Sequence, residues 1–460
     1  MSTTRRPRDG LLARVNFPLY AVDMLTSRHV LVAGGGGSSK SGVANGFEIY
    51  EIFHNGQHFC AQEMVRHETG ANVVMNFAIR NEGRRALLCA GQESHCQMYI
   101  VNPRVLSDDG KEEISISGED KANKGNHDFR AHENGLRNRR NFTSGVEDLP
   151  NGHNINATRD KQPLPTVPPD QNSNLKRHLK FDIKAGDSVQ SDFLSTEPLQ
   201  RVVRISPNGH IMVTGGTDGH LRVWSFPQML LEADIEAHTK EVDDIDISPD
   251  SKYIITIAKD GLGLVWDIKS SKRHYELNWD MPEGTKYLYK RCRYGTVEAQ
   301  RDHYRLFCIA NPLGKVGKQR GYLQQWDCAT GKLRIAVGID ESLSSLAVRD
   351  DGRFIATGTM CSGSVSIYIA FSLQRVLHVP NAHAMFVTGL QFLPVTNEEG
   401  PPISSDTEAA VLSISVDNKV CIHSLQQRRK HYSSLGGYYI DCNGVICSIY
   451  VMFLLRTLSY

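Results

Sequence analysis

A run of small, flexible residues is the segment whose residue types and spacing suggest chemistry or recognition. Residues 34–46 begin with four consecutive glycines and continue through Lys40, Gly42 and Val43 to Asn45. Glycine weakens a strand unless the backbone needs a positive φ angle or a close approach, so the run indicates a specialised backbone. Three interpretations fit it: a phosphate-binding loop, a plain flexible hairpin, or a shaped loop that protrudes and binds a partner.

The phosphate-loop interpretation fails on context. Residues 34–41 match G-x-x-x-x-G-K-[ST], except that Ser39 replaces the glycine before the lysine. Such a loop leads into a helix whose amide groups meet the phosphates, whereas residues 47–52 alternate as a strand does. The sequence also has no recognisable acidic strand to bind magnesium. The hairpin and the partner-binding loop therefore remain.

The elements that position this loop are read from an internal repeat. Residues 202–224 and 245–267 share an order of strand, turn, strand and tryptophan, and the matching residues Asp218 and Asp260 are 42 positions apart. That spacing is typical of a WD-type repeat. Weaker copies bring the number of units to about seven. We therefore predict an all-β fold, a seven-bladed WD40-like β-propeller whose last blade is completed by a strand from a chain end.

Composition changes along the chain set the expected boundaries. We expect an N-terminal tail at 1–16, the propeller at 17–427, and a basic stretch with a hydrophobic tail at 428–460. Residues 103–184 are polar, with too few large apolar residues to offset the entropy of ordering. We expect them to form a disordered inter-blade insertion, although a basic docking segment at 137–140 is an alternative.

Charge and cysteine content exclude several classes of function. The chain has 52 Lys and Arg against 51 Asp and Glu, so no global positive field attracts nucleic acid, and we expect no nucleic-acid partner. Its ten cysteines contain no C-x-x-C pair, which favours reduced thiols in the cytosol. Cys89 and Cys96 flank His95 without zinc-ligand spacing, so we expect core thiols there.

Some residues that could do chemistry are better explained as structural. His238, Thr256, Asp260 and Trp266 have the order of the buried hydrogen-bonded tetrad that ties a WD blade together. Thr214, Asp218 and Trp224 repeat this pattern without the histidine.

Several longer strings resemble the animal member of the Sec-twelve family of guanine nucleotide exchange factors. They are residues 17–21, the loop at 34–46, and residues 90–97, 214–219 and 363–374. The string Gly-Ser-Val-Ser-Ile-Tyr-Ile-Ala-Phe-Ser-Leu-Gln at 363–374 and the glycine loop are the specific parts of the match.

The resemblance implies a factor that promotes GDP release and GTP loading on a SAR-type small GTPase, and so starts COPII coat assembly and ER-to-Golgi transport. No covalent chemistry is involved, so the protein is not expected to be an enzyme in that sense. Two alternatives stay open: a WD-repeat scaffold without exchange activity, and a DNA-binding transcription regulator, against which the neutral charge argues.

The resemblance also implies a site. In that family the glycine loop is held in shape by a potassium ion and inserts an apolar tip beside the nucleotide of the GTPase. Here the tip would be Val43, and Lys40 would either pair with an acidic residue of the GTPase or keep the loop soluble. The potassium ligands would be backbone carbonyls and the Asn45 amide oxygen, because hard cations prefer oxygen. The glycines in this expected set are Gly34, Gly35, Gly36, Gly37 and Gly42.

The C-terminal tail departs from the family pattern. Relatives end in one transmembrane helix after a basic stretch, which Arg428, Arg429 and Lys430 supply here. The apolar run at 445–455 is about half of the roughly 20 residues that a span needs, and Asp441 lies just before it. We expect anchoring in the endoplasmic reticulum membrane with the propeller in the cytosol, and a soluble form is the alternative.

Overall fold

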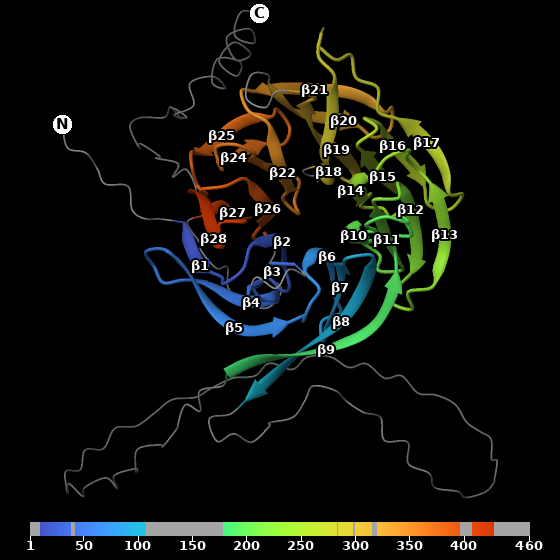
Figure 1. Cartoon of the computed structure of the whole chain (residues 1–460). Coiled ribbons are helices and arrows are strands. Elements are labelled where there is room, and N and C mark those ends of the chain that lie inside the picture. Colours follow the sequence, from blue (N-terminus) through green and yellow to red (C-terminus); the bar gives the residue numbers. More distant parts are fainter. Residues whose placement is uncertain are drawn as a thin grey trace, which may run out of the picture. The chain divides into compact units, whose positions relative to one another are not determined.

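The described part of the chain is built from β-strands. The computed structural model describes residues 10–37, 42–106, 178–282, 284–297, 300–314, 320–395 and 407–426, whose regular elements are the strands β1 to β28. They form seven four-stranded antiparallel sheets arranged in a ring around a central axis (Figure 1). The prediction of a seven-bladed propeller is confirmed.

Each blade is numbered here by its order along the chain, and its strands are given from the axis outward. Blade 1 contains β2 (Leu19–Met24), β3 (His29–Gly35), β4 (Asn45–His54) and β5 (Phe59–Glu68). Blade 2 contains β6 (Val74–Asn81), β7 (Ala86–Gln92), β8 (His95–Leu106) and β9 (His178–Gln190). Blade 3 contains β10 (Gln200–Ile205), β11 (Ile211–Gly216), β12 (His220–Ser225) and β13 (Leu231–Glu236).

The remaining blades follow the same order. Blade 4 contains β14 (Val242–Ile247), β15 (Tyr253–Ala258), β16 (Gly263–Asp267) and β17 (Lys272–Glu276). Blade 5 contains β18 (Tyr287–Val297), β19 (Gln300–Pro312), β20 (Gly321–Asp327) and β21 (Lys332–Ile339). Blade 6 contains β22 (Leu343–Val348), β23 (Phe354–Thr359), β24 (Val365–Ile369) and β25 (Gln374–Val379).

Blade 7 closes the ring with strands from both ends of the chain. It contains β26 (Val387–Phe392), β27 (Thr407–Ser415), β28 (Lys419–Gln426) and, as its outermost strand, β1 (Leu11–Arg14). Leu11 pairs with Cys421 and Arg14 with Lys419. The closing strand was expected, but it comes from within residues 1–16, which the sequence assigned to a tail.

The polar insertion lies inside blade 2, because β8 and β9 are its third and fourth strands. The expected position between two blades is therefore corrected, and so are the edges of the range 103–184. β8 continues to Leu106 and β9 begins at His178. In β9 only every second residue is apolar. Leu179, Phe181 and Ile183 pack against the core between blades 1 and 2, so the strand was hard to recognise from the sequence. Residues 107–177 lie outside the described residues.

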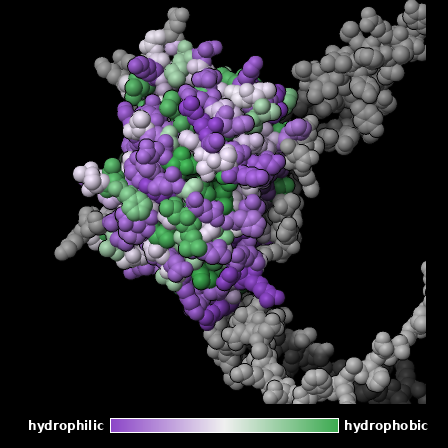
Figure 2. All heavy atoms as spheres, turned by 90° about the vertical axis from the view of Figure 1, so that its right-hand side faces the viewer, coloured by the Kyte–Doolittle hydropathy of each residue, from purple (hydrophilic) through white to green (hydrophobic). Residues whose placement is uncertain are grey.

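Apolar side chains are buried between neighbouring blades, as a stack of sheets requires. For example, one cluster joins Val32 of blade 1 to Leu412 of blade 7, and another joins Ile255 of blade 4 to Leu306 of blade 5. The rim on the right-hand side of Figure 1 mixes hydrophilic residues with smaller hydrophobic areas (Figure 2). Among the described residues, no helix is long and apolar enough to cross a membrane.

Candidate functional site

The glycine run forms the connection between the second and third strands of blade 1. Gly34 pairs with Gly46, and Gly35 pairs with Asn45, at the ends of β3 and β4. The structure describes residues 36–37 and 42–44 of the connection, which we call the glycine hairpin. Lys40 lies outside the described residues, so its expected role stays a prediction.

Two of the glycines are required by close approaches at the base of the hairpin. A Cβ atom on Gly34 would overlap the backbone carbonyl of Pro18, and one on Gly35 would overlap the Asn45 side chain. Gly35 has a φ angle of 149° and donates its N–H to the Pro18 carbonyl over 3.0 Å. Gly34 and Gly35 therefore let the strand ends approach the link before β2 closely. The sequence indicated a close approach here, but not that Pro18 is the residue approached.

The other glycines lie further out, where space is not the constraint. Gly37 and Gly42 have φ angles of 80° and 76°, and a Cβ on either would meet nothing within 4 Å. These two positions need glycine for the direction of the backbone alone. Gly36 lies between the two groups and is partly buried.

Asn45 is the side chain that shapes the described half of the hairpin. Its Oδ1 accepts the N–H of Gly37 over 2.9 Å. Its Nδ2 lies 3.1 Å from the Gly37 carbonyl oxygen and 3.0 Å from those of Gly70 and Ala71. Asn45 is almost fully buried, and it ties the hairpin to the link between blades 1 and 2.

The surroundings of Asn45 are rich in oxygen. An amide nitrogen has two hydrogens, and here it faces three carbonyl oxygens at nearly equal distances. In this orientation Oδ1 accepts the Gly37 N–H, and rotating the amide would bring its oxygen to these carbonyls only by turning the NH2 group toward that N–H and losing the hydrogen bond. Carbonyl oxygens that converge in this way are the ligands that a hard cation prefers. Of the expected ligands, Gly37 and Asn45 meet here, while Gly34 and Gly35 lie in the strand ladder.

Val43 gives the hairpin an apolar tip, since its side chain is 37% exposed between the exposed Gly42 and Ala44. Below it, β4 is braced by a buried carboxylate. Arg66 Nε lies 2.6 Å from Glu48, and the Tyr50 hydroxyl donates to the other oxygen of that carboxylate. Burial raises the pKa of Glu48, which the Tyr50 and Arg66 contacts oppose. The arrangement can present an aliphatic group on a firm base, and the described residues hold no cluster of acid, thiol or imidazole ligands for a metal.

The glycine hairpin shares one face of the ring with all the links between blades. Strands alternate in direction, so the connection of second to third strands and the link to the next blade lie at the same end of each blade. We call this end the hairpin face. Most of the large apolar side chains that the described residues expose lie on it: Val43, Phe193, Leu194, Leu262, Met281, Leu313, Met385 and Phe386.

The expected tetrad in blade 4 is confirmed as a structural device. His238 Nδ1 lies 3.0 Å from Asp260 Oδ2, and its Nε2 lies 2.8 Å from the Thr256 hydroxyl. Trp266 Nε1 donates to that hydroxyl over 2.9 Å. In blade 3, Trp224 Nε1 likewise donates to Thr214 over 2.9 Å.

Sequence reasoning missed a second tetrad, in blade 7. His383 lies 3.1 Å from Asp417 and 2.8 Å from the Ser413 hydroxyl, which also lies 2.8 Å from His423 Nε2. The histidine precedes its aspartate by 34 residues in blade 7 and by 22 in blade 4. A long connection between β26 and β27 hides the spacing, and His423 replaces the tryptophan.

The thiols that flank His95 are also structural. Cys89 and Cys96 are both free and buried, and the Cys96 thiol lies 3.7 Å from the Met212 sulfur. His95 instead contacts the Ser94 hydroxyl over 3.0 Å. The interpretation of Cys89 and Cys96 as core residues is confirmed.

Comparison with known proteins relates the chain to exchange factors. A family model described as "WD domain, G-beta repeat" matches residues 198–225 and 230–267. Two relatives, from Mus musculus and Rattus norvegicus, are both named "Guanine nucleotide-exchange factor SEC12". They are 31% and 32% identical, and each alignment covers 92% of both chains. "SEC12-like protein 2" of Arabidopsis thaliana is 24% identical over 50% of this chain and 52% of its own length.

Proposed function

The chain belongs to the SEC12 family of guanine nucleotide-exchange factors, and from this we propose that it releases GDP from a SAR-type small GTPase so that GTP can load. By this action it starts COPII coat assembly for ER-to-Golgi transport. The observation that carries the proposal is the exposed Val43 at the end of a hairpin whose base Asn45 holds in place.

The mechanism is differential binding rather than bond chemistry. An exchange factor speeds release only if it binds the nucleotide-free GTPase more tightly than the GDP-bound form. An apolar tip that inserts between the switch segments of the GTPase supplies this difference, because it fits the open form alone. Bracing matters, since a loop that is already ordered loses less entropy on binding. Lys40 would add a contact to an acidic switch residue.

A potassium ion at the base of the hairpin is part of the proposal. The groups that would hold it are the carbonyl oxygens of Gly37, Gly70 and Ala71, toward which Asn45 Nδ2 points. Asn45 would add its amide oxygen only with the amide rotated, at the loss of the hydrogen bond from the Gly37 N–H. The ion would supply a positive charge that fixes these oxygens together. The rest of the expected set, Gly34, Gly35, Gly36 and Gly42, would then shape the loop.

Membrane attachment completes the proposal. Gln426, the last described residue, ends the third strand of blade 7, and the third strand of blade 1 begins at the glycine hairpin. The chain therefore leaves the propeller at the end opposite the hairpin face. Anchored to the endoplasmic reticulum through residues 428–460, the protein would present the hairpin face to the cytosol.

The test is release of a fluorescent GDP analogue from a SAR-type GTPase with and without this chain, in potassium and in sodium. We expect acceleration with the chain, and faster release in potassium. Stabilisation by a bound ion grows with ion concentration, so the melting temperature should also rise more in potassium than in sodium. A release rate equal to that of the GTPase alone would refute the exchange function. Equal rates and equal melting temperatures in both salts would refute the ion.

A further inference from the structure

The links into blades 3, 4 and 7 share one backbone device. In blade 4, the residue after His238 donates its N–H to Asp260 over 3.2 Å. In blade 7, the residue after His383 donates to Asp417 over 2.9 Å. The N–H of Phe193 donates in the same way to Asp218, over 3.2 Å.

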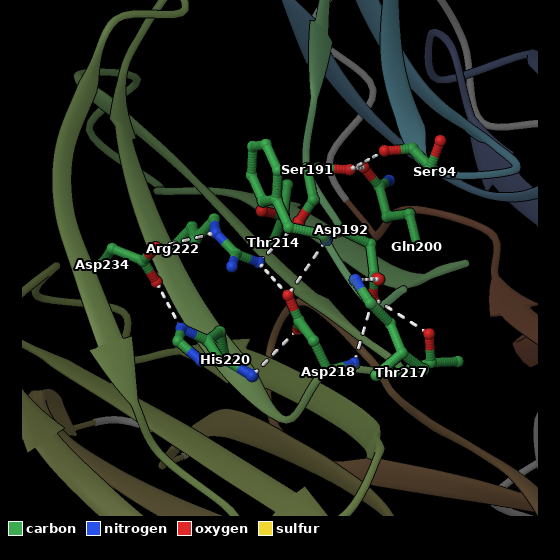
Figure 3. A network of polar contacts seen from close by, with 12 residues as sticks. Ser94, Ser191, Asp192, Gln200, Thr214, Thr217, Asp218, His220, Arg222 and Asp234 are labelled. Atoms are coloured by element: carbon green, nitrogen blue, oxygen red, sulfur yellow. Dashed lines mark hydrogen bonds and ion pairs between the residues drawn. The ribbon is translucent and has the colours of Figure 1, made fainter. Parts of the chain in front are cut away.

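Blade 3 has Asp192 where the other two blades have histidine. This carboxylate is fully buried, and it accepts the N–H of Leu194 over 2.9 Å, the Thr217 hydroxyl over 3.1 Å and the N–H of Asp218 over 3.2 Å. A Cβ on Gly216 would overlap this carboxylate, so the carboxylate occupies the space that a side chain at position 216 would need. Figure 3 shows Asp192, Thr217 and Asp218 joined in this network. The link is thus held by hydrogen bonds to a buried carboxylate.

Arg222 supplies a positive charge beside Asp218 and Asp234. It lies 2.8 Å from Asp218 and 3.2 Å from Asp234, and it donates to the Ser191 carbonyl over 2.8 Å (Figure 3). Its side chain is almost fully buried. Burying charged groups is costly unless they are paired or hydrogen-bonded. Arg222 and Asp218 are paired with each other, and the Asp192 carboxylate accepts three hydrogen bonds. These contacts hold the link backbone through the N–H groups of Phe193 and Leu194 and the Ser191 carbonyl.

The link displays two large apolar side chains on this rigid base. Phe193 is 56% exposed and packs one face over the Arg222 guanidinium at 4.8 Å, and Leu194 beside it is also exposed. In blade 7, Met385 and Phe386 follow the tetrad histidine and are exposed as well. A hydroxyl at Ser415 donates to the Phe386 carbonyl over 2.8 Å and fixes that backbone.

The corresponding link of blade 4 is different. There the residues after His238 are Thr239 and Lys240, which are polar and exposed. The same backbone device therefore carries apolar side chains in two blades and polar side chains in a third, so the apolar pairs are not needed to form it.

The two apolar pairs flank the glycine hairpin on the hairpin face. Going around the ring, one link separates blade 1 from the link that carries Phe193, and one link separates it from the link that carries Phe386. The polar link of blade 4 lies further around. Exposed aromatic side chains on a rigid base are typical of the residues that dominate binding at interfaces.

We propose that Phe193 with Leu194, and Met385 with Phe386, are two apolar docking contacts for the small GTPase on either side of the Val43 tip. This rests on the proposed exchange function and adds a division of labour. The pairs bind the GTPase whether or not nucleotide is present, so they set the affinity. Val43 contacts only the opened form, so it sets the rate of release.

The test is a steady-state exchange assay in which the concentration of the GTPase is varied. For Phe193→Ser with Leu194→Ser we expect the KM for the GTPase to rise about thirtyfold, with kcat within about twofold of wild type. Met385→Ser with Phe386→Ser should act in the same way. Phe371→Ser is the matched control, because Phe371 is 79% exposed and lies on the opposite face. It should change neither constant.

The outcomes separate the two proposals. If the wild-type chain accelerates release and both double variants keep its KM, the docking contacts are wrong while exchange stands. A fall in kcat at unchanged KM also overturns the docking role. If the wild-type chain does not accelerate release, the exchange function fails, and the docking proposal fails with it. Melting curves must show that each double variant folds as the wild type does. The single variant Phe193→Tyr, which keeps the aromatic ring, should have the wild-type KM.

Discussion

Blades 1 and 4 solve the same geometrical problem in different ways. In blade 4 the second and third strands are joined by a short turn, and Asp260 in this turn is locked by His238. In blade 1 the same strands are joined by the glycine hairpin, whose backbone is held by the Asn45 amide instead. The first solution buries the side chains that lock it, and the short turn holds its exposed Leu262 close to the ends of the two strands. The second uses glycines and the buried Asn45 amide to expose Val43 at the end of a longer connection.

The difference indicates which positions serve the WD repeat and which depart from it for a functional reason. A tetrad stabilises any WD blade, so its residues say little about what the protein does. A position where the repeat is abandoned at a cost in backbone entropy needs another reason. The comparison makes a clear prediction: changes in the tetrads should affect folding, whereas changes in the hairpin should affect exchange.

Acid should unfold the protein through the tetrads. Burial lowers the pKa of His423 in blade 7 to about 4, with a smaller contribution from His383. The unfolded chain binds this proton below about pH 6.5, so the free energy of unfolding should fall by about 3 kcal/mol as the pH drops from 6.5 to 4. Urea unfolding at several pH values measures this. His423→Phe should reduce the slope of the profile in this window, where His29, whose pKa burial also lowers to about 4, still contributes. An unchanged profile would contradict the assignment.

Crowding at the base of the hairpin should be costly. In Gly34→Ala the new methyl group would overlap the Pro18 carbonyl, and backbone must shift to admit it. We expect a loss of about 3 kcal/mol in the free energy of unfolding, together with slower exchange. Gly37→Ala is the control, since its methyl group meets open space and only the positive φ angle is unfavourable, at about 1 kcal/mol. Equal losses for the two variants would show that packing at Gly34 is not the constraint.

Removing the Asn45 amide should distinguish an effect on exchange, through the shape of the hairpin, from an effect on the free energy of unfolding. Asn45→Ala deletes the hydrogen bonds to Gly37, Gly70 and Ala71, and we expect a loss of about 2 kcal/mol with exchange reduced about tenfold. His238→Ala should cost a similar free energy of unfolding, yet leave exchange per folded molecule unchanged. Denaturant curves and GDP-release rates on the same preparations measure both. If the two variants lose exchange equally, the distinction between blades 1 and 4 is wrong.

The repeat made the architecture predictable. The spacing from Asp218 to Asp260 and the alternating strands led to the propeller and to one tetrad, because both depend on local sequence. The second tetrad was hidden, since the distance from His383 to Asp417 includes a long connection. The outer strand β9 was hidden as well, because only one of its faces is apolar.

The site was predictable in outline only. The glycine run indicated an unusual backbone, and the structure explains Gly34 and Gly35 by contacts with residues distant in sequence or across the ladder. The carbonyls of Gly70 and Ala71 could not be found from the sequence, because they belong to a link that meets Asn45 only in the folded chain. Asp192 was missed for the same reason, since nothing in its neighbourhood marks it as buried.

The most direct test of the account is the GDP-release rate of Val43→Ala beside that of Val395→Ala. Both valines are exposed, but Val395 lies in the connection between β26 and β27, on the face opposite the hairpin. Loss of two methyl groups from a side chain that becomes buried against the GTPase should slow release about tenfold for Val43→Ala, with an unchanged melting temperature. Val395→Ala should match the wild type. Release by Val43→Ala at the wild-type rate would contradict the account.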